Sequence, residues 1–305
     1  MLSYKCKNCG GEMSVDGSGG LYCEFCGSKH FFQDKEFEDY RVFRKSLLNY
    51  FKGIHDEKVD GTGREDRLWD HAEETGKVLA DGNDVTIRYL YSFNDDGVEG
   101  YLTKSNAIYI FPKADKDKAD KMLSGIKSLE FPPADVKGLN DCFPSFTGSY
   151  DLDDGNRMLA FKRPENLFPL SMFGSFTPEH VAWIISRLEN ICCVLDYSNL
   201  VHGGISADSV WINPFSHHAV LMGHWWSAGK KSVALLFGNS RKDLSDLRKT
   251  ALHILGNHKD ETREPMLDFL NGAPSEDAFT DFERWDNVIE KGLGGRHFAK
   301  MDVNL

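Results

Sequence analysis

The sequence contains no apolar run approaching the roughly 20 residues that a membrane-spanning helix requires, so no membrane partner is expected. The residues after Met1 also lack the apolar segment of a signal peptide, and we therefore expect a cytoplasmic protein. Cationic side chains are in the minority, with 36 Lys and Arg against 47 Asp and Glu and a net charge of −11. Because binding to a phosphate backbone relies on Lys and Arg, this balance disfavours a nucleic-acid partner without excluding a small basic face.

What the sequence does contain is the ordinary composition of a folded protein. Its 305 residues leave room for about two domains, and a hydrophobic content of 41% predicts a sizeable core. The 7 cysteines fit a reducing compartment if four of them bind a metal and the others remain thiols.

Four cysteines near the N-terminus form two C-x-x-C-G motifs, with Cys6 and Cys9 in the first and Cys23 and Cys26 in the second. The glycine after each pair permits a tight turn that directs backbone amides toward the sulfurs. Four thiolates predict a closed, tetrahedral and structural Zn²⁺ site. A redox motif, which would need a thioredoxin-like βαβ context, and two disulfides are the alternatives. The segment resembles the zinc ribbons of bacterial and phage proteins and is assigned to residues 1–32.

Residues 33–77 are expected to form a helical connector. Apolar residues recur at helical spacing over 35–51, and a polar, glycine-containing stretch follows over 55–63. A shorter helix is expected over 65–74. The connector could pack on the domain that follows or stand free of it.

A meander of strands and one helix are expected next. Alternating apolar residues predict strands at 85–91, 101–103 and 107–111, with an acidic turn at 94–100 between the first two. The apolar face of 116–129 predicts a helix. Further strands are expected over Phe143–Leu152 and Arg157–Phe161.

The central stretch of the chain runs from Asn199 to Ser227. Its VHGGISADSVWI resembles the protein-kinase catalytic loop H-R-D-L-x-x-x-N, and its LMGHWWS resembles the D-F-G loop. The run DLSDLRKTALHILG, which begins at Asp243, resembles a later kinase helix. The resemblance covers residues 78–305 and extends to degenerate kinase-like proteins of bacteria and phages. It implies an α+β, bilobal kinase-like fold with an N-lobe over about 78–161 and a C-lobe over about 165–305.

The positions that carry catalytic groups in kinases hold other residues here. They are Gly204 for the catalytic Asp, Ser206 for the loop Lys, Ser209 for the metal-binding Asn, Gly223 for the D-F-G Asp and Phe111 for the ATP-binding Lys. Phosphoryl transfer needs such groups to hold Mg²⁺ and neutralise developing charge. The segment between the D-F-G position and the DLSDL helix is also short and lacks an A-P-E motif. The resemblance therefore implies a pseudokinase, and we do not expect ATP as a cofactor.

Two residues of these motifs are expected to have structural roles: His202 against the backbone of the second loop, and Asp243 against the backbone of the first. His217, His218 and His224 raise the idea of a second metal site close to His202. No carboxylate or cysteine completes such a set, so turn and core roles are favoured.

Three functional hypotheses follow. The favoured one is a catalytically inactive pseudokinase that serves a protein partner as a scaffold or regulatory module, with Zn²⁺ in its ribbon. The second is a divergent kinase or nucleotidyl transferase that uses other acids, such as Asp208 or Asp246. The third is a nucleic-acid-associated protein led by the zinc ribbon, which the charge disfavours.

Overall fold

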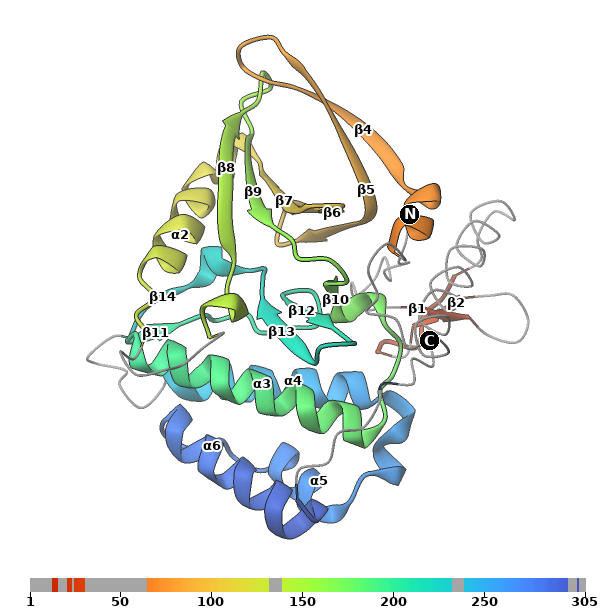
Figure 1. Cartoon of the computed structure of the whole chain (residues 1–305), viewed down its shortest axis with the longest axis vertical. Coiled ribbons are helices and arrows are strands. Elements are labelled where there is room, and N and C mark those ends of the chain that lie inside the picture. The colour runs from red at the N-terminus through yellow and green to blue at the C-terminus, as the bar shows by residue number, and fades with distance from the viewer. Residues whose placement is uncertain are drawn as a thin grey trace.

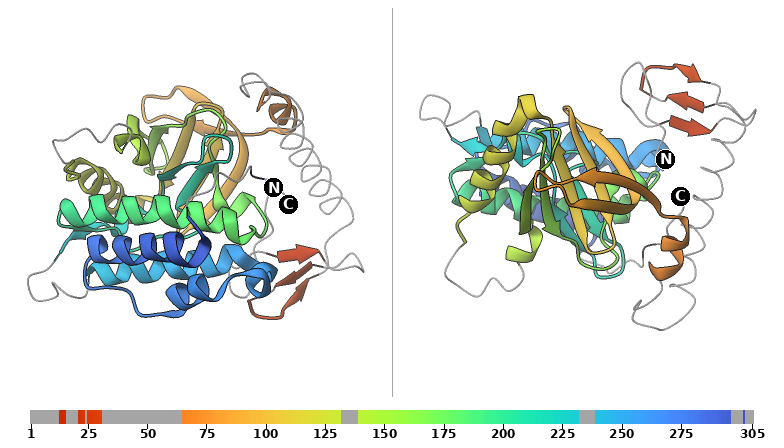
Figure 2. Two further views of the ribbon diagram at one scale, coloured as in Figure 1. Left: turned by 60° about the horizontal axis from the view of Figure 1, so that its bottom comes forward. Right: turned by 90° about the horizontal axis from the view of Figure 1, so that it is seen from above.

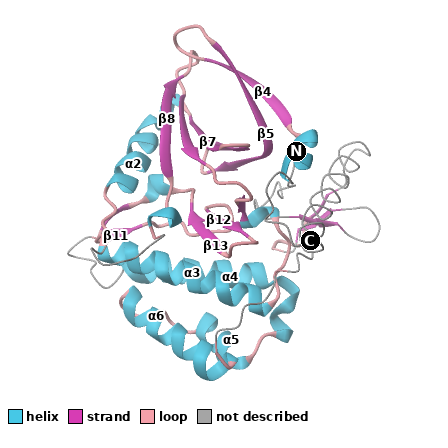
Figure 3. Cartoon of the chain, viewed as in Figure 1, coloured by secondary structure: helices cyan, strands magenta, loops and turns pink. Residues whose placement is uncertain are grey.

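The computed structural model of the chain describes residues 13–15, 21–23, 25–30, 65–131, 139–231, 239–295 and 301. Cys6, Cys9 and most of the expected connector lie outside the described residues. Two lobes lie one above the other (Figure 1), with most strands in the upper lobe and most helices in the lower lobe, as Figure 3 shows. The α+β class expected from the sequence is therefore confirmed.

The N-terminal strands form a three-stranded antiparallel sheet in the order β1-β2-β3. They are β1 (Met13–Val15), β2 (Leu21–Cys23) and β3 (Lys29–His30). In β2 the side chains of Leu21 and Cys23 are buried and Tyr22 between them is exposed, which is the alternation of a strand with one covered face. This small sheet lies to one side of the lobes (Figure 2).

The upper lobe is built on a six-stranded antiparallel sheet in the order β4-β5-β6-β7-β9-β8. Its strands are β4 (Glu73–Val78), β5 (Asp84–Asp95), β6 (Val98–Thr103), β7 (Asn106–Phe111), β8 (Ser145–Asp151) and β9 (Arg157–Lys162). The short turn η2 (Lys113–Asp115) leads from β7 into helix α2 (Lys116–Lys127), which packs against β7 and β9. One face of the sheet enters the main core, and the other carries a smaller apolar cluster.

The two outer strands of this sheet meet at one end. Leu79 and Leu152 form an isolated antiparallel bridge, and the Ala80 amide donates to the Asp151 carbonyl at 2.9 Å. The sheet therefore curls at the top of Figure 1, where the β4–β5 and β8–β9 turns come together.

The lower lobe contains four α-helices among its described residues. They are α3 (Pro178–Tyr197), α4 (Asn239–Leu255), α5 (Glu264–Asn271) and α6 (Ala278–Asn287). Pro178 at the first position of α3 suits a helix start, because its missing N–H would have no partner there. Helix α3 packs against α4 and α6. No helix in the described ranges is both long and apolar enough to cross a membrane.

Short elements complete the lower lobe. The strands are β10 (Phe168–Pro169), β11 (Leu200–Val201), β12 (Val210–Asn213), β13 (His218–Leu221) and β14 (Gly229–Lys230), paired as β10-β12-β13 and β11-β14. The helical turns are η3 (Asn140–Cys142), η4 (Leu170–Met172), η5 (Trp225–Ser227), η7 (Gly256–Glu261) and the π-helical η8 (Val288–Leu293).

The start of the upper lobe differs from the sequence-based expectation. The short helix expected over 65–74 is present as the 3-10 helix η1, Glu65–His71. The expected connector does not continue as helix beyond it, because Glu73–Val78 is the edge strand β4 of the main sheet. Strand β4 pairs on one side only, and none of its side chains is fully buried. Its sequence, EETGKV, therefore lacks the apolar alternation on which the prediction of strands depended.

A buried ion pair attaches η1 to the link between the lobes. Arg163 Nη1 donates to Glu65 Oε1 at 2.6 Å, and both side chains are almost completely buried. The same carboxylate accepts from Trp69 Nε1 at 3.1 Å and from the Asn166 amide at 2.7 Å. Three donors thus compensate a carboxylate that would be costly to bury alone.

Candidate functional site

Two loops of the lower lobe meet beneath the upper sheet. The first, 202–209, follows β11, and the second, 222–224, joins β13 to η5. Strands β12 and β13 pair with each other and bring the two loops together. The Ser209 carbonyl accepts from the amides of Met222 at 2.8 Å and Gly223 at 3.0 Å.

His202 and Asp243 hold the backbone of these loops. His202 Nε2 lies 2.9 Å from the Gly223 carbonyl, and because a carbonyl only accepts, Nε2 carries the proton. Burial, assisted by the nearby charge of His224, lowers the pKa of His202 to about 3, so the ring is neutral. Asp243 on α4 accepts from the amides of His202 at 2.8 Å and Gly203 at 2.7 Å. Burial raises the pKa of Asp243 to about 6, and these two amides act in the opposite direction.

The space beside Gly204 is occupied by an imidazole ring. A Cβ placed on Gly204 would lie 1.9 Å from His224 Cδ2 and 2.6 Å from Nε2. His224 has a φ of +63° and directs its Nδ1 to Asp95 Oδ2, at 2.7 Å, on the last residue of β5. No side chain fits at Gly204 while His224 holds this position, and the ring joins the two lobes.

Ser206 and Ser209 bond to each other. The Ser206 amide donates to Ser209 Oγ at 2.8 Å, and the Ser209 amide donates to Ser206 Oγ at 3.2 Å. Both hydroxyls are thereby engaged in closing a short turn. At Gly223, a Cβ would lie 3.2 Å from both Ser209 Cα and Tyr109 Oη, so an aspartate there would require a neighbour to move.

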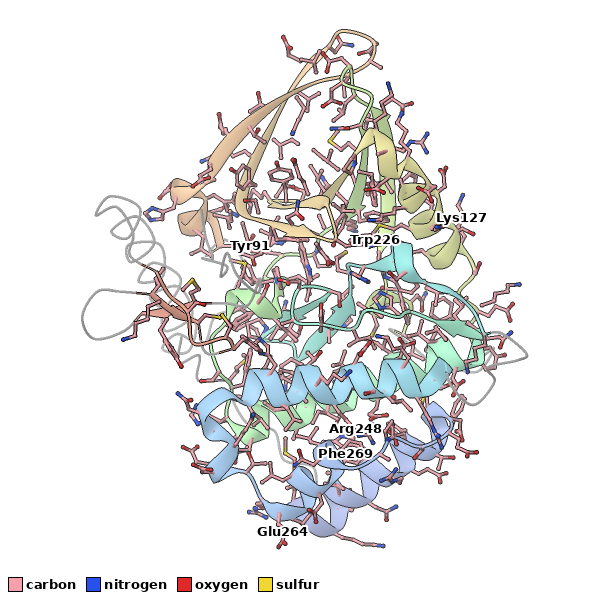
Figure 4. All side chains as sticks on the ribbon, turned by 180° about the vertical axis from the view of Figure 1, so that it is seen from behind. Tyr91, Lys127, Trp226, Arg248, Glu264 and Phe269 are labelled. Atoms are coloured by element: carbon pink, nitrogen blue, oxygen red, sulfur yellow. The ribbon has the colours of Figure 1, made fainter. Side chains whose placement is uncertain are left out.

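Aromatic side chains fill the space between the loops and the sheet. We use the term aromatic layer for the buried rings of Phe93, Tyr109, Phe111, Phe161 and Trp226. Figure 4 shows Trp226 at the boundary between the lobes. Its ring centroid lies 5.7 Å from that of Phe111 and 6.1 Å from that of Tyr109, with edge-to-face geometry in both cases.

Tyr109 is the polar exception in the aromatic layer. In the described part of the chain its hydroxyl has no hydrogen-bond partner, and the side chain is fully buried. Burial, together with the charges of Asp95 and Asp208, raises the pKa of Tyr109 well above its ordinary value, so the phenol is neutral. Of the two alternative acids, Asp208 thus acts on the site through Tyr109. Asp246 acts on it as well, because its charge adds to the effect of burial in raising the pKa of Asp243.

Helix α2 directs small and apolar side chains inward. Ala119, Met122 and Gly125 are its buried residues, and a Cβ on Gly125 would lie 3.0 Å from Ala228 Cβ at the end of η5. On the outer side, Lys118 Nζ donates to the carbonyl of Asp96 at 2.7 Å and to its Oδ2 at 2.9 Å. The hydrogen bond from Lys118 holds the pKa of Asp96 below its ordinary value. The acidic turn is thus held from α2 and, through Asp95, from the lower lobe.

The remaining histidines of the predicted cluster lie in separate environments. His217 stacks on Trp183 with ring centroids 4.7 Å apart, and His218 Nε2 lies 2.9 Å from the Asp141 carbonyl. The residues that the structure describes contain no group of three or more His, Cys, Asp or Glu placed to hold a metal. Cys6 and Cys9, half of the predicted zinc site, fall outside them.

The described half of the cysteine motif forms a tight turn. Gly27, at a φ of +70°, donates its amide to the Cys23 carbonyl at 2.8 Å, and the Cys23 amide donates to the Ser28 carbonyl at 2.9 Å. This turn suits thiolate donors, because a glycine at positive φ lets the chain reverse immediately after Cys26. The Phe25 ring of the same turn lies 4.9 Å from that of His253 on α4.

The sequence alone did not identify Asp95 and Trp226 as part of the site. His224 could be located, because it follows the glycine at the D-F-G position, but its partner lies 129 residues away in the chain. No local pattern indicates such a contact. For Trp226 the sequence indicated a hydrophobic side chain but not that it belongs to the site.

No protein-family model and no curated protein matches the chain. Among solved structures, the chain is similar to one described as the structure of vaccinia related kinase 3. The TM-score is 0.48 and the sequence identity 12%, over 70% of this chain and 95% of that one. A similarity of this degree is not evidence of activity.

Proposed function

We propose that this chain is a catalytically inactive kinase-like protein that works by binding a protein partner. The observation that carries the proposal is the position of His224, whose ring fills the space beside Gly204 and bonds to Asp95 in the other lobe. In the kinase resemblance this space belongs to the catalytic carboxylate. With the ring in this position, no carboxylate side chain can stand at Gly204 to accept the proton of an acceptor hydroxyl.

The kinase-like assignment is supported by contacts inside the chain. His202 bonds to the carbonyl at the D-F-G position, and Asp243 receives two amides of the first loop. These contacts preserve the shape of the two loops although the acidic side chains are absent. Loops that keep their shape without these acidic groups are consistent with a binding role that needs no catalysis.

The composition of the site disfavours Mg-ATP. Magnesium binds oxygen ligands and substrate phosphates in near-octahedral geometry. At the positions of the metal ligands the chain offers Gly223, which has no side chain, and Ser209, whose hydroxyl closes a turn. Where the phosphate-binding lysine would stand, Phe111 packs on Trp226. Apolar rings at this place stabilise neither the metal nor a triphosphate.

The N-terminal cysteines are proposed to hold one structural Zn²⁺. Cys23 and Cys26 lie on the tight turn described above, and Cys6 and Cys9 repeat the same spacing. When bound by four thiolates, the ion would supply folding stability to the small sheet, since a closed site has no position for substrate.

Thermal melting with Mg-ATP tests the inactive assignment. A ligand present at a hundredfold its Kd stabilises a protein by about 2.7 kcal/mol, which shifts the Tm measurably. We expect no shift with millimolar Mg-ATP relative to Mg²⁺ alone and ATP alone, and no transfer of the γ-phosphate to the chain or to a generic protein acceptor. A shift that requires both Mg²⁺ and ATP would show that the site binds the nucleotide, and transfer of the γ-phosphate would reject the proposal in favour of a divergent enzyme. Loss of that transfer in Asp208→Asn would then identify its acid.

A further inference from the structure

The two edges of the main sheet differ in chemistry. Strand β4, at one edge, carries Glu73, Glu74 and Lys77, and charges of this kind deter other strands from pairing with an open edge. Strand β8, at the other edge, has the sequence SFTGSYD, without Lys, Arg, Glu or Pro. Its one interruption is a register shift between Phe146 and Gly148.

Strand β8 is at the edge of the sheet, and no described strand pairs with its outer side. Within the described ranges, β9 is its only partner strand, and the Asp151 carbonyl at its far end receives the Ala80 amide. All of its residues except Gly148 are exposed, including Phe146 and Tyr150, each with 44% of its surface accessible. Unpaired backbone groups next to exposed aromatic rings are the two requirements for recognising an added strand: the backbone supplies hydrogen bonds, and the side chains supply selectivity.

The charge of the protein indicates which kind of partner segment would bind beside β8. The turn that follows β8 exposes Asp153 and Asp154, and the whole chain carries a net charge of −11. The cations nearest the strand's end, Lys116 and Arg157, are already engaged with Asp151. A second copy of the chain would bring the same negative charge, whereas a basic segment gains attraction as it approaches.

We propose that β8 is the docking edge for an extended, basic segment of another protein, which adds a strand beside it. The segment would alternate apolar residues, which contact the rings of Phe146 and Tyr150, with Lys or Arg. It would contain no proline in the paired stretch, because proline cannot donate to the ladder. This proposal names the partner class for the binding role proposed above and rests on that role.

Selection from a phage-displayed library of random ten-residue peptides, with the full-length protein as bait, tests this edge. We expect enriched peptides to be proline-free, net positive and alternately apolar. Hydrogen exchange in the presence of a synthetic enriched peptide should slow for residues 145–151 and not for the charged edge at 73–78. A copy of that peptide with N-methyl groups on alternate residues should bind at least about tenfold more weakly, because it lacks the backbone donors.

Charge placed on the edge should weaken binding. We expect at least about tenfold lower affinity for Phe146→Lys/Tyr150→Lys and a change within about twofold for Phe279→Lys, an equally exposed aromatic on α6. Phe146 also contacts Phe161, so its replacement could disturb the fold. Ser149 is exposed and has no aromatic ring, so Ser149→Lys adds a positive charge to the edge without removing a ring contact, and Ser149→Glu adds a negative charge at the same place. Ser149→Lys should weaken the basic peptide and Ser149→Glu should not.

Several results would overturn the proposal. They are no enrichment from the library, peptide binding that is unchanged in Ser149→Lys, or exchange protection elsewhere in the chain. A dimer that Ser149→Lys dissociates in sedimentation would also overturn it, because β8 would then pair with a second copy of the chain. Each leaves the inactive assignment intact, because that assignment stands on the Mg-ATP measurement. Mg²⁺-dependent transfer of the γ-phosphate would reject inactivity without altering what binds β8.

Discussion

His224 Nδ1 lies 2.7 Å from Asp95 Oδ2, so a side chain of the lower lobe is bonded to the end of β5 in the upper lobe. Only 19% of the His224 side chain and 22% of the Asp95 side chain are accessible to solvent. A contact that is partly shielded from water is weakened less by salt than a surface pair. It links the acidic turn of the sheet to the loop that carries Gly223, and it leaves the lobes with a direct side-chain connection across the site.

A double-mutant cycle should measure this connection. We expect Asp95→Ala and His224→Ala to be coupled by about 1 kcal/mol in the free energy of unfolding, because the contact is shielded and well aligned. Urea unfolding of the wild type, both single variants and the double variant gives the value. The exposed pair Asp117–Lys121, on one helix, is the control and should show coupling below about 0.5 kcal/mol. Equal coupling in the two cycles would contradict the role of the Asp95–His224 bond.

Gly204→Ala should destabilise the protein by about 1–3 kcal/mol, because the new methyl group would overlap His224. The same change at Gly229, where nothing lies within 4 Å of a Cβ, should cost less than about 0.5 kcal/mol. In a His224→Ala background the penalty at Gly204 should largely disappear. Urea unfolding of these variants checks all three expectations, and a penalty at Gly204 that persists without the imidazole would refute the steric explanation.

Stability should depend on pH through His202. Its pKa is about 3 in the folded protein against an ordinary value of 6.5, so between these values the unfolded chain binds more protons than the folded chain. The free energy of unfolding therefore falls as the pH falls from 6.5 toward 3. Asp243, with its pKa raised from 3.8 to about 6, acts in the opposite sense between those two values.

The variant His202→Gln isolates the histidine contribution, because Asp243 remains in both proteins. We expect the stability advantage of the wild type over His202→Gln to be smaller at pH 5 than at pH 7.5, as measured by urea unfolding. An advantage that stays constant or grows on acidification would show that the ring is not held neutral in the folded state.

The zinc proposal predicts about one Zn²⁺ per chain by elemental analysis, and its loss in Cys23→Ser or Cys26→Ser. Cys192→Ser is the matched control, since this cysteine is buried in α3 among apolar neighbours, and it should leave the zinc content unchanged. Zinc content unaffected by both ribbon substitutions would reject the site. Melting of the lobes should be little changed by chelation, because their core is separate from the small sheet.

Much of the element order could be predicted, because periodicity is a local property of the chain. In residues 84–95 and 178–197, the apolar residues recur at the spacing of a strand and of a helix respectively, and many of these apolar side chains are buried in the structure. Strand β4 was not predicted, because it is an edge strand with no fully buried side chain and its sequence therefore shows no alternation of apolar residues. Thr177, a residue type that often caps helices, precedes α3, but its hydroxyl makes no capping bond, which the sequence could not show.

The site was predictable only in part. Gly204 and Gly223 could be singled out from motif order, which is again local. What occupies the space beside them depends on contacts between distant segments, such as Trp226 on Phe111 and His224 on Asp95. Asp95 belongs to the acidic turn that the sequence predicts, but its bond to an imidazole of the other lobe is a contact that no local pattern indicates.

The buried carboxylate of Glu65 has a mechanical consequence. Because it is bonded to Arg163 and to the Asn166 amide, the chain that comes from the N-terminal sheet is anchored where the lobes join. A force that reaches Glu65 would therefore act where the lobes join, whereas the cysteine-bearing turn has a separate contact with the lower lobe, through the rings of Phe25 and His253.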